Sequence, residues 1–480
     1  MNRFFLLKFF FLCILFWQNT LFSQAYNPPI RMELTLLKDY QSIKMNVVGK
    51  NGLVVVADNE DKKSWTLSHY DTNFYNIISK KIDFNTTVAL YKVFVTETLY
   101  CAVFHSQYTT SHNTFFLSYD IEHQKINVYA VNLPEKEYVV FLGQIGDFIV
   151  FSTVNNKREI LYSLDCKTSS VSKLNFGTNE GSYTIEFLQR DTFNNCLQIG
   201  AICYEKGIVN IALTSVNDSG TIENIVKTNL DEKYLISSLQ YVAVGDDYQI
   251  ITGSFRLKGI MNNNQNIRNG LFTISIANNN IEKIHYLPYS NIENLNSSQR
   301  KSMLSNNTYS HTYSICQNDS LHILVTEFYN IKFSSTYPTL TSYDYAYPTY
   351  RYNFALISFI NKEGYFSNFY MFNFNGLSSK EVLYLLAGQM TEEGLLIYFA
   401  FEDNLYSITY NKETNTQPVQ IESILPLHRS DIVKFNYAAD CLHWYDNKYI
   451  YIGKQKLLKR GASKKTGIRT VLYASKLIYD

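Results

Sequence analysis

The sequence has 480 residues, of which 46% are hydrophobic and 18% charged, and its formal net charge is +1. This apolar content argues against a disordered chain, and the near-neutral charge gives no overall field for nucleic acid. The 39 Tyr and 32 Phe, against 20 Gly and 8 Pro, are typical of a strand-rich protein.

The N-terminal residues have the three regions of a secretory signal peptide. Arg3 and Lys8 supply positive charge, Phe9–Trp17 is apolar, and Ser23–Ala25 places small residues before a cut. The apolar run is shorter than the roughly 20 residues of a membrane span. We predict a signal peptide over residues 1–25 and export to the periplasm, the cell surface or the medium, without a transmembrane segment.

A unit of short apolar strands and polar turns then recurs roughly every 50 residues, apart from two wider intervals. Its second strand is the clearest element. The eight second strands are Leu53–Val56, Leu99–Ala102, Phe148–Phe151, Leu197–Gly200, Tyr248–Ile251, Leu321–Leu324, Leu395–Tyr398 and Tyr449–Ile452. A third strand follows each and tends to end in Asp or Asn, as at Asp71, Asp120 and Asn411, where these side chains favour a turn. Four antiparallel strands per unit are the signature of propeller blades.

The last unit predicts how the ring closes. It begins near Asn436 and stops after a third strand, Val471–Tyr479, whereas Met32–Leu37 precedes the four strands of the first unit. If Met32–Leu37 supplies the missing strand, no blade edge stays unpaired. We predict an all-β closed propeller of eight four-stranded blades, with seven as the alternative, in a single domain over residues 26–480.

The strand Leu161–Asp165, followed by Lys167 and Thr168, resembles the Asp-turn-Thr pattern of lactonase-like and quinoprotein-like propellers. Over residues 31–480 the chain resembles the broad class of irregular, exported bacterial-type β-propellers. The Gly-His and Trp-Asp marks of WD40 blades, the paired kelch glycines and the sialidase box are absent. The resemblance therefore implies a fold and no active site.

Six cysteines follow the signal peptide: Cys101, Cys166, Cys196, Cys203, Cys316 and Cys441. An exported chain could pair them in up to three disulfides. Several lie within predicted strands, where a thiol packs as a small apolar group, so we favour free thiols. No Cys-x-x-Cys pair supports a zinc site.

The two faces of the predicted propeller differ. Turns between first and second strands are short, whereas the opposite face receives long insertions at His105–Asn113, Arg256–Asn269, Ser290–His311, Tyr329–Tyr350 and Lys454–Arg469. Long loops on a rigid scaffold commonly carry binding residues. We therefore expect the long-loop face to be the working surface.

Two groups on this face are candidate ligand-binding residues. Tyrosine stacks on sugar rings or anchors a protein interface, and cations meet phosphate, anionic lipid or an acidic partner. The candidates are Tyr337, Tyr343, Tyr345, Tyr347 and Tyr350 with Arg256, Arg268, Lys459 and Arg460. The alternatives are that the tyrosines pack back onto the blade and that the cations are merely solvated.

Catalytic patterns are weak, since neither a Gly-x-Ser-x-Gly nor a His-Glu-x-x-His motif occurs. Ionisable residues near the ends of second strands could reach the channel mouth: Asp58, Glu205, Glu327, Glu402, Asp403, His105 and Arg256. We assign no catalytic residue, metal or cofactor and favour a protein that is not an enzyme.

The main functional interpretation is a non-catalytic recognition or scaffold propeller that binds a protein partner in the cell envelope, for example an outer-membrane or secretion complex. The first alternative is a glycan-binding module that uses the tyrosine-rich loop. The second is a glycan-cleaving or lactonase-like enzyme. Fold alone does not choose among them.

Overall fold

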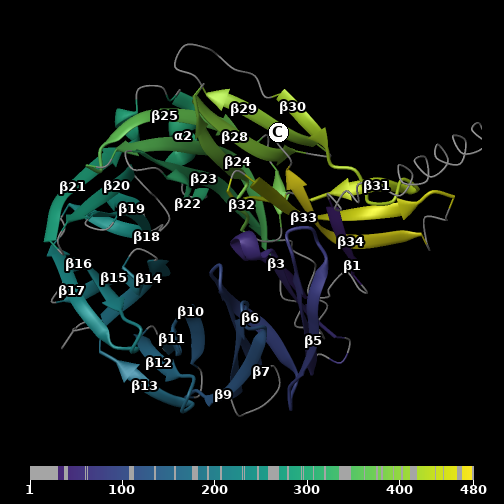
Figure 1. The fold of residues 1–480 in the computed structure, drawn as a ribbon. Coiled ribbons are helices and arrows are strands. Elements are labelled where there is room, and N and C mark those ends of the chain that lie inside the picture. The colour runs from purple at the N-terminus through teal and green to yellow at the C-terminus, as the bar shows by residue number, and fades with distance from the viewer. Residues whose placement is uncertain are drawn as a thin grey trace, which may run out of the picture.

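The computed structural model describes residues 31–477, apart from the segments 37–41, 107–112, 176–181, 258–269, 334–347, 411–418 and 462–466 and gaps of one to three residues. The strands form eight antiparallel sheets, arranged as blades in a ring (Figure 1). The predicted all-β propeller of eight blades is therefore confirmed, and the seven-bladed alternative is excluded. The predicted signal peptide, residues 1–25, lies outside the described residues.

In blades 1 to 7 the strands follow chain order, from the axis of the ring to its rim (Figure 1). Blades 1 and 2 comprise β2 (Ile43–Val47), β3 (Leu53–Asp58), β4 (Ser64–Tyr70), β5 (Asn76–Asp83), β6 (Val88–Val95), β7 (Leu99–Ser106), β8 (Asn113–Asp120) and β9 (Lys125–Asn132). Blades 3 and 4 comprise β10 (Tyr138–Ile145), β11 (Phe148–Asn155), β12 (Arg158–Asp165), β13 (Ser170–Leu174), β14 (Ser182–Asp191), β15 (Cys196–Glu205), β16 (Ile208–Val216) and β17 (Ile222–Asn229).

The later blades are longer. Blades 5 and 6 comprise β18 (Tyr234–Gly245), β19 (Tyr248–Leu257), β20 (Gly270–Ala277), β21 (Asn280–Pro288), β22 (Thr308–Gln317), β23 (Leu321–Phe333), β24 (Pro348–Asn361), β25 (Phe366–Asn373) and the short β26 (Ser378–Ser379). Blade 7 comprises β27 (Leu386–Thr391), β28 (Gly394–Phe401), β29 (Asn404–Tyr410) and β30 (Val419–Ser423). Blade 8 comprises β31 (Asp431–Asn436), β32 (Asp440–Tyr445), β33 (Lys448–Lys459), β34 (Ile468–Leu477) and β1 (Arg31–Thr35).

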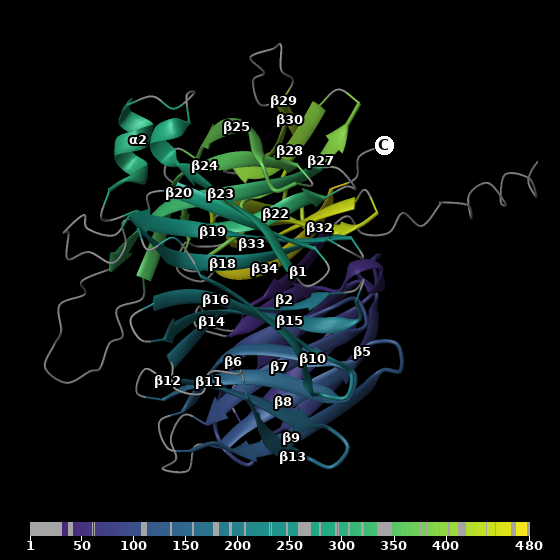
Figure 2. The same cartoon turned by 90° about the vertical axis from the view of Figure 1, so that its left-hand side faces the viewer.

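Three short helical segments accompany the strands: η1 (Gly49–Asn51), η2 (Tyr289–Asn291) and α2 (Ser297–Met303). Figure 2 shows α2 at one edge of the molecule, outside the sheets. No helix in the described part of the chain is long and apolar enough to cross a membrane. Cys101, Cys166, Cys196, Cys203 and Cys441 are free thiols, as expected, and the side chain of Cys316 lies outside the described residues.

Burial explains the strand composition. The side chains of Leu53–Val56 in β3 are buried on both faces, because each blade is packed between two others. The rim strand β5 is mostly exposed and carries the polar sequence Asn76–Asp83. A cluster of buried apolar side chains fills every junction between successive blades, including that between blades 8 and 1. This burial is the main favourable contribution to the ring.

The expected turn chemistry is present where third strands end. The Asp71 carboxylate accepts hydrogen bonds from the backbone N–H groups of Asn73 and Tyr75, each at 2.8 Å. Asp165 accepts from Lys167 N–H at 2.7 Å and from the Thr168 hydroxyl at 2.9 Å. These acids therefore start the turn into the fourth strand, as the sequence pattern predicted.

Strand β1 completes blade 8. It pairs antiparallel with β34 from Arg31 opposite Ser475 to Thr35 opposite Val471, and Leu36 N–H donates to Thr470 O at 2.9 Å. The predicted pairing of the N-terminal strand with the last unit is thus confirmed. Because β1 covers the outer edge of β34, the ring closes without an open edge at this blade.

A buried carboxylate fixes β1 in this place. The side chain of Glu33 is 2% exposed, and its oxygens lie 2.9 Å from Arg31 Nε and 3.1 Å from Arg469 Nη2. Leu427 N–H also donates to Glu33 at 2.7 Å. Arg469 further contacts Asp431 at 2.6 Å, so one network joins β1, β34 and β31.

The junction between blades 8 and 1 has its own polar contact. Trp444 Nε1 donates to the carbonyl of Gly52 at 3.1 Å, and the Trp444 ring stacks on Phe74 with centroids 5.6 Å apart. Gly52 has φ of 106°, and a Cβ there would lie 2.0 Å from Tyr70 O. Only glycine fits this turn, because an L side chain would be strained and would clash.

We predict that Glu33→Ala lowers the free energy of unfolding by about 3–5 kcal/mol, because Arg31 then stays buried without an acid. Denaturant-induced unfolding of the purified protein measures this difference. The control is Asp83→Ala, which removes an ion pair with Lys81 whose side chains are 70% and 58% exposed, and should leave stability unchanged. Equal stability of the three proteins would contradict the role assigned to Glu33.

A second buried acid joins blades 3 and 4. Glu159 of β12 accepts a hydrogen bond from Ile185 N–H of β14, where β14 has a bulge between Ile185 and Phe187. Burial raises the pKa of Glu159 from its usual value near 4.5 to about 7, against the opposing effect of the hydrogen bonds. In this pH interval the folded protein holds a proton that the unfolded chain has lost.

The contribution of Glu159 to the free energy of unfolding should therefore fall as pH rises from about 4.5 to 7, by roughly 3 kcal/mol in total. We predict that Glu159→Gln, which keeps an acceptor for Ile185 N–H, removes this part of the pH dependence and leaves the variant the more stable protein at pH 8. Unfolding curves at a series of pH values test this. A pH profile unchanged by the substitution would show that Glu159 ionises normally in the folded protein.

Candidate functional site

A cavity of about 270 Å³ lies between blades 2 and 3. Its lining residues are Tyr91, His105, Ser106, Asn113, Glu137 and Tyr138. They come from β6, the end of β7, the start of β8 and the connection that enters β10. Second strands end and third strands begin on this side, so the cavity opens on the long-loop face that the sequence singled out.

Two tyrosines form the apolar part of the site. Tyr91 is the extra residue of a bulge in β6, where the register shifts between Leu90 and Lys92, and bulges commonly redirect side chains beside functional sites. Tyr138 begins β10 of the next blade. The two rings are 47% and 46% exposed, and their centroids lie 6.3 Å apart in an edge-to-face arrangement. They offer ring surface to a ligand in the cavity.

His105 joins the two blades beneath these rings. Its Nε2 accepts a hydrogen bond from Val139 N–H at 3.4 Å, and its Nδ1 lies 3.0 Å from the Thr114 hydroxyl. Because Nε2 accepts, Nδ1 carries the proton of a neutral ring and donates to Thr114. The Tyr91 ring stands edge-to-face on His105 with centroids 5.0 Å apart. The imidazole is thus held in one tautomer and one orientation.

Glu137 is the carboxylate of the cavity and is buried. The Thr153 hydroxyl donates to its Oε2 at 2.7 Å. Burial raises the pKa of Tyr162, and the nearby Glu137, to which Tyr162 is hydrogen-bonded, adds to the shift. Among the described residues no cation pairs with Glu137. A buried carboxylate held by neutral donors beside a cavity is a candidate functional group.

In the described part of the chain, no cluster of three or more His, Cys, Asp or Glu side chains could hold a metal ion. The cavity lining combines one carboxylate, one imidazole, two phenols, one hydroxyl and one amide. Such a set can bind hydroxyl groups and move protons.

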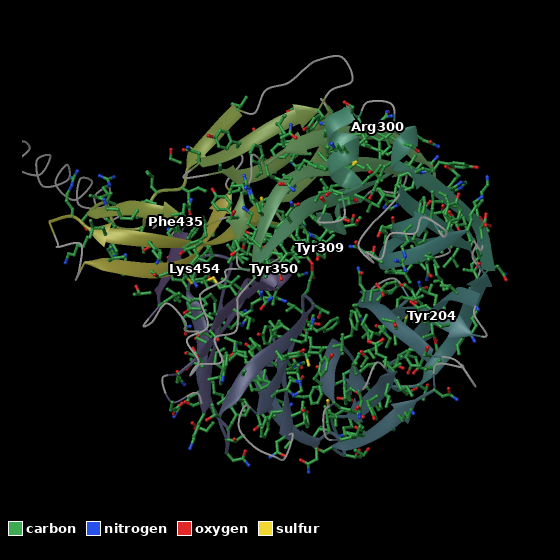
Figure 3. The ribbon with its side chains drawn as sticks, turned by 180° about the vertical axis from the view of Figure 1, so that it is seen from behind. Tyr204, Arg300, Tyr309, Tyr350, Phe435 and Lys454 are labelled. Atoms are coloured by element: carbon green, nitrogen blue, oxygen red, sulfur yellow. The ribbon has the colours of Figure 1, made fainter. Side chains whose placement is uncertain are left out.

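The residues predicted from the sequence lie elsewhere. Tyr337, Tyr343, Tyr345, Tyr347 and Arg268 are outside the described residues. Tyr350 lies near the start of β24 and is half-buried (Figure 3). Its ring packs edge-to-face on Tyr329 with centroids 5.6 Å apart, which agrees with the alternative that these tyrosines pack onto the blade.

The three described cations occupy two blades. Arg256 lies at the end of β19 in blade 5, where its charge acts on Tyr204, and Lys459 and Arg460 are exposed at the end of β33 in blade 8. None of these predicted residues lines the cavity between blades 2 and 3. Of the strand-end residues considered from the sequence, His105 does.

Sequence reasoning missed Tyr91, Glu137 and Tyr138. His105 marked the start of a long insertion, but nothing in the sequence distinguished these two tyrosines among the 39 of the chain. The bulge at Tyr91 and the approach of the blade 3 connection become visible only in the folded ring.

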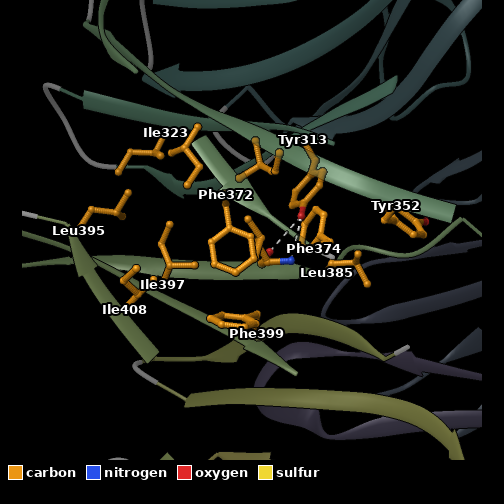
Figure 4. Packing of buried hydrophobic residues seen from close by; sticks show 14 of the residues in the cluster. Tyr313, Ile323, Tyr352, Phe372, Phe374, Leu385, Leu395, Ile397, Phe399 and Ile408 are labelled. Atoms are coloured by element: carbon orange, nitrogen blue, oxygen red, sulfur yellow. Dashed lines mark hydrogen bonds between the residues drawn. The ribbon is translucent and has the colours of Figure 1, made fainter. Parts of the chain in front are cut away.

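Glu327, another strand-end candidate, has a structural role. It is fully buried, and its Oε1 accepts from the Tyr313 hydroxyl at 2.5 Å and from Leu385 N–H at 2.9 Å, while Oε2 lies 3.2 Å from His311 Nε2. Leu386 N–H in turn donates to the Tyr313 hydroxyl at 3.1 Å. Figure 4 shows Tyr313 and Leu385 within the apolar cluster that joins blades 6 and 7. Glu327 therefore fastens blade 7 to blade 6.

We predict that Glu327→Ala lowers the free energy of unfolding by about 3 kcal/mol, because it leaves Leu385 N–H without its acceptor and Tyr313 with only the longer bond to Leu386 O at 3.2 Å. Thermal or denaturant unfolding checks this. Tyr384→Ala, which shortens a side chain that is 46% exposed at the same junction, is the control and should cost much less. A Glu327→Ala protein as stable as the parent would return Glu327 to the functional candidates.

No protein-family model and no curated protein match the chain. Solved structures match it at low identity. The β-propeller domain of the trilobed protease from Pyrococcus furiosus is 9% identical, with 78% of this chain and 96% of that chain covered and a TM-score of 0.35. Polysaccharide lyase Uly1 is 9% identical, with 80% and 89% covered and a TM-score of 0.39.

A post-proline cleaving enzyme from Rickettsia typhi is 11% identical, and the match covers 92% of this chain and 59% of that enzyme at a TM-score of 0.37. The similarity is one of fold, and no activity is transferred from it. The finer resemblance to exported bacterial-type propellers finds no matching family model and stays a prediction.

The main functional interpretation from the sequence, a non-catalytic scaffold for a protein partner, is corrected here. The similar structures are named as peptidases and a polysaccharide lyase, not as scaffolds, although the similarity is one of fold. The physical reason lies in the chain itself: its long-loop face contains a concave site with a buried carboxylate and an oriented imidazole, which a scaffold does not require.

Proposed function

We propose that the protein acts on carbohydrate and that the cavity between blades 2 and 3 holds one sugar residue of a glycan. The observation that carries this proposal is the pair of half-exposed rings, Tyr91 and Tyr138, beside the buried Glu137 carboxylate. A cavity of 270 Å³ is close to the lower limit for small-molecule sites and suits a single ring.

The lining fits both surfaces of a sugar. The C–H faces of a pyranose ring pack on aromatic rings, which Tyr91 and Tyr138 supply. Its hydroxyl groups need acceptors and donors, which Glu137, Asn113 and Ser106 supply. Recognition therefore depends on a few polar groups placed against an apolar wall.

If the protein cleaves its glycan, the lining does not offer the pair of carboxylates that most glycosidases use, but one carboxylate and one imidazole. Hydrolysis by two carboxylates needs a second acid within about 5–9.5 Å of the first, and of the six lining residues Glu137 is the one acid. The proton acceptor of this proposal is Glu137, and His105 faces it from the neighbouring blade as the second titratable group of the lining. A glycan-binding site without turnover is the second candidate, because both His105 nitrogens are already hydrogen-bonded.

The test is a glycan panel assayed with the purified protein for binding and for release of reducing ends. We predict that Tyr91→Ala and Tyr138→Ala each weaken binding by about 1–2 kcal/mol, or roughly 5- to 30-fold, with little change in melting temperature. Tyr365→Ala is the matched control, because Tyr365 is similarly exposed but lies in the hairpin turn between β24 and β25.

Glu137→Gln separates the two candidates. Loss of cleavage with binding retained supports the enzyme, whereas binding by the parent without any product supports the binding module. If no glycan binds, or if the Tyr91 and Tyr138 variants bind as well as the Tyr365 variant, the proposal is wrong.

A further inference from the structure

The end of blade 8 that carries Lys459 and Arg460 is built differently from the other blades. Strand β33 has 12 residues: its first half pairs with β32 and its second half, Gln455–Lys459, pairs with β31. Figure 1 shows β31, β33 and β34 extending beyond the ring of blades. We call this end, with the segment 425–430 that leads into β31, the blade 8 tip.

The blade 8 tip exposes apolar side chains. Ile432, Leu458 and Ile468 form one row across three strands. Phe435, which Figure 3 labels, lies opposite Lys456 on the same face. Ile432, Phe435 and Ile468 are 40%, 53% and 48% exposed. A soluble protein tolerates such residues singly, whereas a group of them marks an interaction surface.

The opposite face of the tip adds further apolar surface. Arg469 follows Ile468 in β34, so its side chain is on the opposite face of the strand. It contacts Glu33, and Leu427 N–H donates to the same Glu33, so Leu427 lies beside that opposite face. Leu427 is 47% exposed, and Leu425 beside it is 67% exposed. Exposed apolar residues therefore lie beside both faces of the tip.

The charge of the tip is positive. Arg429, Lys434, Lys459 and Arg460 are exposed. The acids of its described residues are Glu33 and Asp431, whose side chains are 2% and 4% exposed and paired with arginine. In the described part of the tip, the exposed charge is therefore positive.

We propose that the blade 8 tip docks the protein on the surface of an anionic lipid bilayer. A bilayer accommodates a projecting tip with exposed apolar groups beside both of its faces, because lipid surrounds it, whereas a flat protein surface would cover one face. Anionic headgroups complement the four exposed cations. This docking is independent of the cavity between blades 2 and 3, which belongs to different blades.

The experiment is co-sedimentation of the purified protein with vesicles of phosphatidylcholine alone or with about a third phosphatidylglycerol. We expect binding to the mixed vesicles that weakens with salt. The triple variant Lys434→Glu, Lys459→Glu, Arg460→Glu should lose roughly a hundredfold in affinity, at about 1 kcal/mol for each cation. The double variant Phe435→Ser, Ile468→Ser should also weaken binding, because it removes apolar side chains that enter the bilayer.

The matched control is Val128→Ser with Val171→Ser, two similarly exposed residues on rim strands of blades 2 and 3, which should bind as the parent does. Melting temperatures exclude unfolding as the cause. Failure to bind the mixed vesicles, or equal binding by the tip variants, would overturn the proposal. Binding to soluble polyaspartate without binding to vesicles would overturn it in favour of an acidic protein partner.

Discussion

The ring depends on the buried ion network of Glu33, because the strand that carries it is the piece that closes the last blade. Seven blades are built from contiguous segments, and each buries both faces against its neighbours. Blade 8 has a rim strand only if β1 pairs with β34. The guanidinium group of Arg31 and the carboxylate of Glu33 are buried in that arrangement. An ion network of this kind is costly to leave half-formed, so it favours the one register in which every partner is met.

The same physical device recurs at the blade junctions. A side chain near the long-loop end of one blade accepts a backbone N–H from the first strand of the next blade or from the residue just before it: Glu159 from Ile185, and Glu327 from Leu385. His105 occupies the position in β7 that Glu327 occupies in β23, the seventh residue of the strand, and accepts from Val139. The cavity between blades 2 and 3 is therefore built around a position that has a structural role elsewhere. Here the acceptor is the imidazole of His105, with Glu137 and two exposed tyrosines beside it, whereas the junctions between blades 3 and 4 and between blades 6 and 7 use a glutamate.

The architecture could be read from the sequence because it is repeated. Second strands such as Leu53–Val56 are apolar on both faces, and turn residues such as Asp71 lie at fixed offsets, so eight copies reinforce one another. The site could not be read in this way. Tyr91 and Tyr138 belong to different blades, 47 positions apart, and meet because a bulge in β6 turns one of them out. The tyrosine-rich loop drew attention by composition, and Tyr350, the described one of its five candidate tyrosines, packs against Tyr329.

Strand donation also delays closure of the ring until the end of synthesis. Arg31 is bonded to Gln455, 424 residues later in the chain, so at 5–20 residues per second β1 waits on the order of 20–85 s for its partner. Throughout this time the first strand of the domain has unpaired N–H and C=O groups, and the ring is an open arc with two apolar blade faces at its ends. The nascent chain is then most exposed to pairing with other chains, so its biogenesis favours slow collapse or a chaperone that shields β1 until the last strand emerges.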